Sequence, residues 1–142
     1  MRRVLLMLGV FSVLVGLPWF LETPAMGGSS QLPGDGPAYR FEELTDGVHF
    51  AIGTGAMVVM SNALVIINDD HVMLVDSSVT PAAARALVAQ IKAELTDKPI
   101  RYVIKSHYHF DHAHGYQIFG DEVEIIGHDY VRQMHLSNVL EQ

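Results

Sequence analysis

Four of the chain's eight histidines lie within eight consecutive positions, from residue 107 to residue 114. Within this segment, His107, His109, Asp111 and His112 form the pattern His-x-His-x-Asp-His. The chain has no cysteine, so any zinc site must use imidazole and carboxylate ligands. We therefore predict that these four residues bind metal ions. The alternative from the residues alone is a histidine-rich surface turn or a metal-sequestering tract.

The spacing of the four residues suits two neighbouring metal ions. The motif follows an expected strand, and residues two apart at a strand end face the same way, so His107 and His109 can bind one ion. Asp111 and His112 are adjacent and, in a turn after the strand, can reach a second ion. Such paired ions lie about 3.5–4 Å apart and share a bridging water. Two zinc ions are the expected cofactors, and iron or manganese would accept the same donors.

The remaining histidines give weaker signals. His49, His71 and His135 have no companion ligand nearby in the sequence, and we expect ordinary surface or packing roles for them. His114 and His128 stay open as residues that contact metal or substrate, because they lie close to the motif or at the end of an expected strand.

The motif must be positioned by an α/β framework. Turn residues from Asn68 to Asp70 separate two apolar segments and predict a hairpin. The expected strands are Val48–Ile52, Met57–Asn68, His71–Val75, Ile100–Ile104 and Val123–Ile126. Strands that first form a hairpin and then alternate with helices indicate a mixed β-sheet with helices on one face. Ligand sites of open α/β sheets gather at the carboxyl ends of strands, where the motif is expected.

A helix should connect the hairpin to the strand before the motif. Thr80 can cap it and Pro81 can be its first residue, while Lys98 and Pro99 end it. Its apolar stripe is formed by Ala84, Leu87, Val88, Ile91 and Leu95. A short helix is also expected over Tyr116 to Phe119.

The N-terminal sequence predicts an export signal, and the alternative is a buried core helix over the same apolar residues. Two arginines precede an apolar run from Val4 to Leu21, and small residues near Ala25 could be cleaved. We expect a signal peptide or N-terminal membrane anchor over residues 1–25, a flexible linker over 26–38 and a folded domain over 39–142. The protein is then periplasmic or secreted, or alternatively anchored in the inner membrane, and it contacts membrane only through an uncleaved N-terminal segment.

Charge narrows the choice of partners. The formal net charge is −7, which disfavours nucleic acid because phosphate contacts need clustered lysine and arginine. A small-molecule substrate is expected instead, and no feature of the sequence specifies an oligomeric state.

The motif and its surroundings resemble the metallo-β-lactamase superfamily from about Tyr39 onward. The resemblance implies the N-terminal half of an αββα sandwich, two metal ions, usually zinc, and hydrolytic chemistry. It places His107 and His109 on the first ion and Asp111 and His112 on the second. It also implies that Asp76 braces the metal loop through hydrogen bonds, and that Gly115 lets the chain turn tightly after the motif.

Family members continue well beyond this length and supply further ligands, so we expect this chain to be incomplete at its C-terminus. The resemblance implies a dizinc hydrolase that uses a metal-bound hydroxide, with Asp111 as the catalytic residue that orients it. The bond cleaved stays open among β-lactam, thioester, lactone and other esters. The alternatives are an exported metal-binding module and an inactive truncated remnant of such a hydrolase.

Overall fold

The computed structural model describes residue 34 and residues 36–140 of the 142-residue chain. The expected leader over residues 1–25 lies outside the described residues, as does most of the expected linker. Within the described residues, no helix combines the length and the apolar character needed to cross a membrane.

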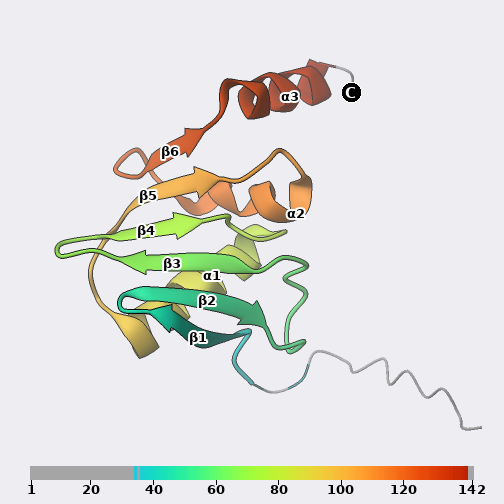
Figure 1. Cartoon of the computed structure of the whole chain (residues 1–142). Helices are drawn as coiled ribbons and strands as arrows, with labels where there is room; N and C mark the ends of the chain where they lie inside the picture. Colours follow the sequence, from blue (N-terminus) through green and yellow to red (C-terminus); the bar gives the residue numbers. More distant parts are fainter. Residues whose placement is uncertain (1–33, 35, 141–142) are drawn as a thin grey trace, which may run out of the picture.

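Six strands form one mixed sheet in which the spatial order follows the sequence order (Figure 1). They are β1 (Tyr39–Thr45), β2 (Val48–Gly53), β3 (Ala63–Ile67), β4 (Val72–Val75), β5 (Ile100–Lys105) and β6 (Glu124–Gly127). Strands β1 to β4 pair antiparallel, whereas β5 is parallel to both β4 and β6. The predicted mixed sheet and the predicted hairpin between β3 and β4 are therefore confirmed.

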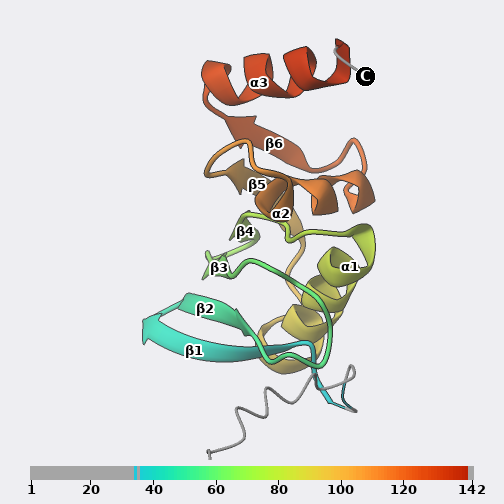
Figure 2. The same cartoon turned by 90° about the vertical axis from the view of Figure 1, so that its right-hand side faces the viewer.

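Two helical segments cover one face of the sheet. These are α1 (Pro81–Gln90), continued by a π-helical turn (Ile91–Leu95), and α2 (Phe110–Ala113), continued by a 3-10 helix (His114–Ile118). Seen along the sheet in Figure 2, α1 and α2 lie on the same side, while α3 (Asp129–Leu140) lies past β6 at the sheet edge. The predicted cap is present, because Thr80 Oγ1 accepts a hydrogen bond from the N–H of Ala83 at 3.1 Å.

The core lies between α1 and the sheet. Val65, Leu74 and Val103 are opposite one another on β3, β4 and β5, and all three are fully buried with Leu87 of α1. Because alternate strand residues point to opposite faces, their neighbours line the other face of the sheet. That face carries half-buried apolar side chains and is not covered by any layer formed by the described residues.

The strand predicted over Met57–Asn68 is wrong in its first half, because only Ala63–Ile67 is a strand. The preceding residues form a loop in which Met60 has a left-handed φ of 58°. The carbonyl of Val59 accepts hydrogen bonds from the N–H of Ser61 and the hydroxyl of Ser78. These bonds take the loop away from the sheet ladder and toward the motif.

Gly115 allows the 3-10 helix to pack directly against the residues after β4. Gly115 is buried, and its N–H donates to the carbonyl of Ser78 at 3.0 Å. A Cβ at this position would collide with the carbonyl oxygen of Ser77 and lie 2.7 Å from the Cβ of Ala84. The sequence-based reason given for Gly115, a tight turn, is replaced by close approach of two backbones.

We predict that Gly115→Ala lowers the free energy of unfolding by about 3 kcal/mol, because neither neighbouring backbone can move away cheaply. Denaturant titration monitored by circular dichroism measures the change. Gly127→Ala is the control, since its Cβ would meet only the Lys105 side chain at 3.4 Å. Equal stability of the two variants would contradict the packing argument.

Candidate metal centre

The His-x-His-x-Asp-His motif begins immediately after β5, at the carboxyl end of the strand. His107 lies in the connecting loop, and His109 immediately precedes α2. Asp111 and His112 lie within α2, not in the turn that the sequence suggested. His107, Asp111 and His112 are half-buried, whereas His109 is exposed. The motif therefore joins a rigid strand end to a short helix.

The structure brings the four side chains of the motif together. The ring centroid of His107 lies 4.8 Å from that of His109 and 4.1 Å from that of His112. The Nε2 atom of His112 lies 3.4 Å from Oδ2 of Asp111. Three imidazoles and one carboxylate thus share one small region, a donor set whose chemistry fits zinc.

The four donors are close neighbours, but they do not surround one point. Among the described residues, no three histidine, aspartate or glutamate side chains are arranged to hold a single metal ion. Two donors per ion, as the resemblance implies, is compatible with this arrangement. Because zinc takes about four ligands, two of them from this motif leave each ion in need of further donors.

Asp76 links the end of β4 to the motif through its carboxylate. Oδ1 accepts the backbone N–H of Ser106 at 3.0 Å, and Oδ2 accepts the Ser106 hydroxyl at 2.7 Å. Oδ2 also accepts the Nδ1–H of His112 at 2.8 Å. Asp76 is itself buried and has a left-handed φ of 66°. The structure therefore places Asp76 beside the motif as a bracing residue.

These bonds fix which nitrogen carries the proton in two of the histidines. A carboxylate only accepts hydrogen bonds, so His112 must donate from Nδ1. The single hydroxyl proton of Ser106 points to Asp76, so Ser106 Oγ accepts from Nδ1 of His107 at 2.9 Å. Both rings then leave the Nε2 lone pair free for a metal ion, as second-shell bonds commonly arrange.

Two further serines hold the backbone of the motif. The hydroxyl of Ser61 donates to the carbonyl of Asp111 at 2.5 Å. Ser77 donates to the carbonyl of His112 from its N–H at 3.0 Å and from its hydroxyl at 3.2 Å. Sequence reasoning missed Ser61 and Ser106 as supporting residues. Their only signal in the sequence was a small polar residue beside an apolar strand.

The remaining histidines lie outside this cluster. His114 is exposed and tilted against the ring of Phe110, with centroids 5.7 Å apart. His128 accepts the N–H of Tyr130 on Nδ1 at 3.1 Å, next to the start of α3. His71 bonds to the carboxylate of Asp70 at 2.6 Å, and this bond lowers the pKa of Asp70.

Tyr116 lies close enough to Asp76 for the charge of its carboxylate to act on the Tyr116 hydroxyl. Burial is the main cause that raises the pKa of its hydroxyl, and the negative charge of Asp76 raises it further. Tyr116 therefore stays protonated and cannot add a second negative charge beside Asp76.

Comparison with known proteins agrees with the fold. The family description "Metallo-beta-lactamase superfamily" matches residues 56–125. A probable metallo-hydrolase of Bacillus subtilis, YqjP, is 39% identical over 69 residues, which cover 46% of this chain and 21% of that protein.

Solved structures show the same similarity. A metallo-β-lactamase from Hirschia baltica is 29% identical, with a TM-score of 0.60 over 70% of this chain and 48% of its own. The enzyme from Erythrobacter litoralis, solved with β-mercaptoethanol in its active site, is 25% identical, with a TM-score of 0.60 over 70% and 46%. FIM-1 from Pseudomonas aeruginosa, solved in a mono-zinc form, shares the fold at 21% identity, with a TM-score of 0.63 over 75% and 49%.

The chain belongs to the metallo-β-lactamase superfamily, as the residues of the motif predicted. It spans about a fifth of the curated relative and just under half of each of these solved chains.

We predict that Ser106→Ala weakens zinc binding by about tenfold or more, because His107 loses the partner that orients its ring. Competition with a chromophoric zinc chelator measures the affinity. Ser137→Ala is the matched control, since it also removes one serine hydrogen bond, to the carbonyl of Met134 in α3. Zinc affinity equal to that of the control would show that Ser106 does not position a ligand.

Proposed function

We propose that this chain forms the ligand-bearing part of a dizinc hydrolase that acts on a small molecule. In this proposal His107 and His109 hold one zinc ion, while Asp111 and His112 hold the other. The observation that carries the proposal is the convergence of the four motif side chains beside a carboxylate, Asp76, that fixes two of their rings. Membership of a superfamily of metallo-hydrolases supports it.

Zinc ions, when bound, lower the pKa of water toward about 7 and polarise the substrate oxygen. The protein's own residues then have separate tasks. Asp111 is partly exposed, and its Oδ2 can hold the attacking water and help to move its proton. Ser106 and Asp76 hold the Nδ1 protons of His107 and His112, so that Nε2 of each ring can face a metal ion.

The surroundings of the motif favour a substrate with an apolar part. The loop before β3 is tied to Asp111 through Ser61 and carries two large exposed side chains, Val58 and Met60. Phe110, next to Asp111, is also half exposed. Exposed apolar side chains gathered beside polar groups are typical of ligand-binding rims. Esters, thioesters, lactones and β-lactams with an apolar substituent all fit this description.

We predict that Asp111→Asn lowers kcat by about 10²–10⁴-fold, because the amide cannot accept the proton of the water. Chromogenic β-lactam, thioester, lactone and phosphodiester substrates should be tested on the full gene product with zinc supplied. Asp121→Asn is the control, an exposed aspartate beyond the motif. Unchanged turnover in Asp111→Asn would exclude a catalytic role for this residue.

Zinc stoichiometry distinguishes the alternatives. Two ions per chain, with turnover lost on chelation and restored by zinc, support the hydrolase. The second candidate is a metal-binding module without turnover, whose binding would be weak because the described residues contain no three-donor group. That module would bind one ion weakly and hydrolyse none of the substrates, whereas insoluble protein would indicate an inactive remnant.

We also propose that the protein is exported, on the basis of the basic and apolar N-terminal segment. The expected mature protein begins after Ala25, and N-terminal sequencing of the periplasmic or secreted fraction measures this. An intact Met1 in the membrane fraction would support the anchor instead. An intact Met1 in the cytoplasmic fraction would contradict export.

A further inference from the structure

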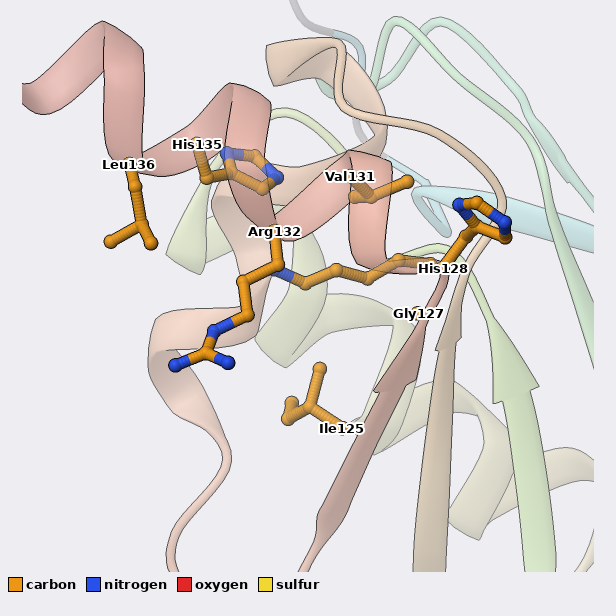
Figure 3. Close-up of a pocket in the computed structure, with 8 residues that line it drawn as sticks. Ile125, Gly127, His128, Val131, Arg132, His135 and Leu136 are labelled. Atoms are coloured by element: carbon orange, nitrogen blue, oxygen red, sulfur yellow. The ribbon is translucent and has the colours of Figure 1, made fainter.

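A pocket of about 230 Å³ lies between α3 and the ends of β5 and β6. Figure 3 shows Arg132 and Leu136 reaching from α3 toward Ile125 of β6. None of the residues that line it belongs to the metal-binding motif. The lining includes four basic side chains, from Lys105, His128, Arg132 and His135, and it includes no aspartate or glutamate.

The lysine and the arginine of the pocket lack ion-pair partners among the described residues. In the described part of the chain, neither Lys105 nor Arg132 forms an ion pair. The Nζ atom of Lys105 lies 4.2 Å from the ring centroid of Tyr116, a contact that leaves its charge unneutralised. The Nε2 atom of His135 is buried and has no hydrogen-bond partner among the described residues. Buried polar atoms are normally satisfied, so this one indicates an absent partner.

Burial and nearby positive charge both disfavour protonation of His135. Burial lowers the pKa of His135, and the charges of Lys105 and His114 lower it further. This cationic pocket lies in a chain whose formal net charge is −7, so overall composition does not explain it. An anion in the pocket would relieve both the repulsion and the burial of unpaired charge.

The walls of the pocket are apolar. Val131 is buried at its base, whereas Ile125 and Leu136 are 39% and 55% exposed at its rim. A small inorganic ion would leave these rim side chains in water. A ligand with an apolar body would cover them while its charged end reached the basic groups.

We propose that this pocket binds a small organic carboxylate. Its carboxylate would meet Arg132, Lys105 and His135, and its hydrocarbon part would pack on Ile125 and Leu136. Arginine suits a carboxylate because its planar group can donate two parallel hydrogen bonds. The inference does not depend on hydrolysis at the motif.

Benzoate is a suitable probe, and benzamide is its neutral counterpart of nearly the same shape. Titration of the full chain, with excess chelator so that no metal site can bind the carboxylate, should perturb the NMR signals of Ile125, Val131 and Leu136. We expect Arg132→Gln to weaken benzoate binding by about tenfold or more, because a charged hydrogen bond is lost. Arg85→Gln, which removes an exposed arginine of α1, should leave the affinity unchanged.

A second variant controls for the case in which Arg132→Gln unfolds α3 rather than removing a ligand contact. Lys105→Met lies on β5 and keeps the aliphatic stem against Tyr116, and it should weaken benzoate binding to a similar degree. Benzamide binding as tightly as benzoate would overturn the proposal, as would equal affinity in the parent and both variants. Inorganic phosphate binding as tightly as benzoate would overturn the role of the apolar walls.

Discussion

The carboxylate of Asp76 is the constraint on which the rest of the site depends. It stands at the end of β4 and accepts three hydrogen bonds, two from Ser106 after β5 and one from His112 in α2. The left-handed backbone at Asp76 costs about 1–2 kcal/mol, whereas hydrogen bonds to charged groups contribute about 1.5–3 kcal/mol each. The bonds therefore outweigh the strain. Removing the carboxylate would release two ligand rings together, because both take their orientation from it.

The parallel pairing of β4 and β5 allows Asp76 to reach Ser106 and the motif. Val75 of β4 lies opposite Ile104 of β5, so the next residues of both strands leave the sheet at the same edge. The N–H of Asp76 still bonds to the carbonyl of Ile104, which keeps the two strand ends in register. The contact at Gly115 then brings the helical segment after the motif against the residues that follow β4. Strand pairing and helix packing thus hold the same site from two sides.

Sequence patterns predicted the parts of the fold that depend on interactions between residues close in sequence. Thr80 before Pro81 marked the start of α1, and the turn residues after β3 marked the hairpin, because caps and turns depend on residues close in sequence. The loop before β3 could not be found this way. Its apolar, β-branched residues read as a strand, and only long-range bonds from Ser61 and Ser78 make it a loop. The same limit applies to Ser106, whose role needs Asp76, 30 positions away.

Two neighbouring residues at the end of β5, Lys105 and Ser106, contact regions of opposite charge. Lys105 turns toward Tyr116 and the basic pocket under α3, while Ser106 turns toward Asp76 and the metal ligands. Ser106 follows the last residue of β5, and the two neighbouring side chains take part in separate sets of contacts. The metal region relies on Asp76 and Asp111 for negative charge, and two divalent cations would exceed it. In the proposed two-zinc site, further donors beyond the motif would have to balance the charge as well as complete the coordination, and carboxylates would do both.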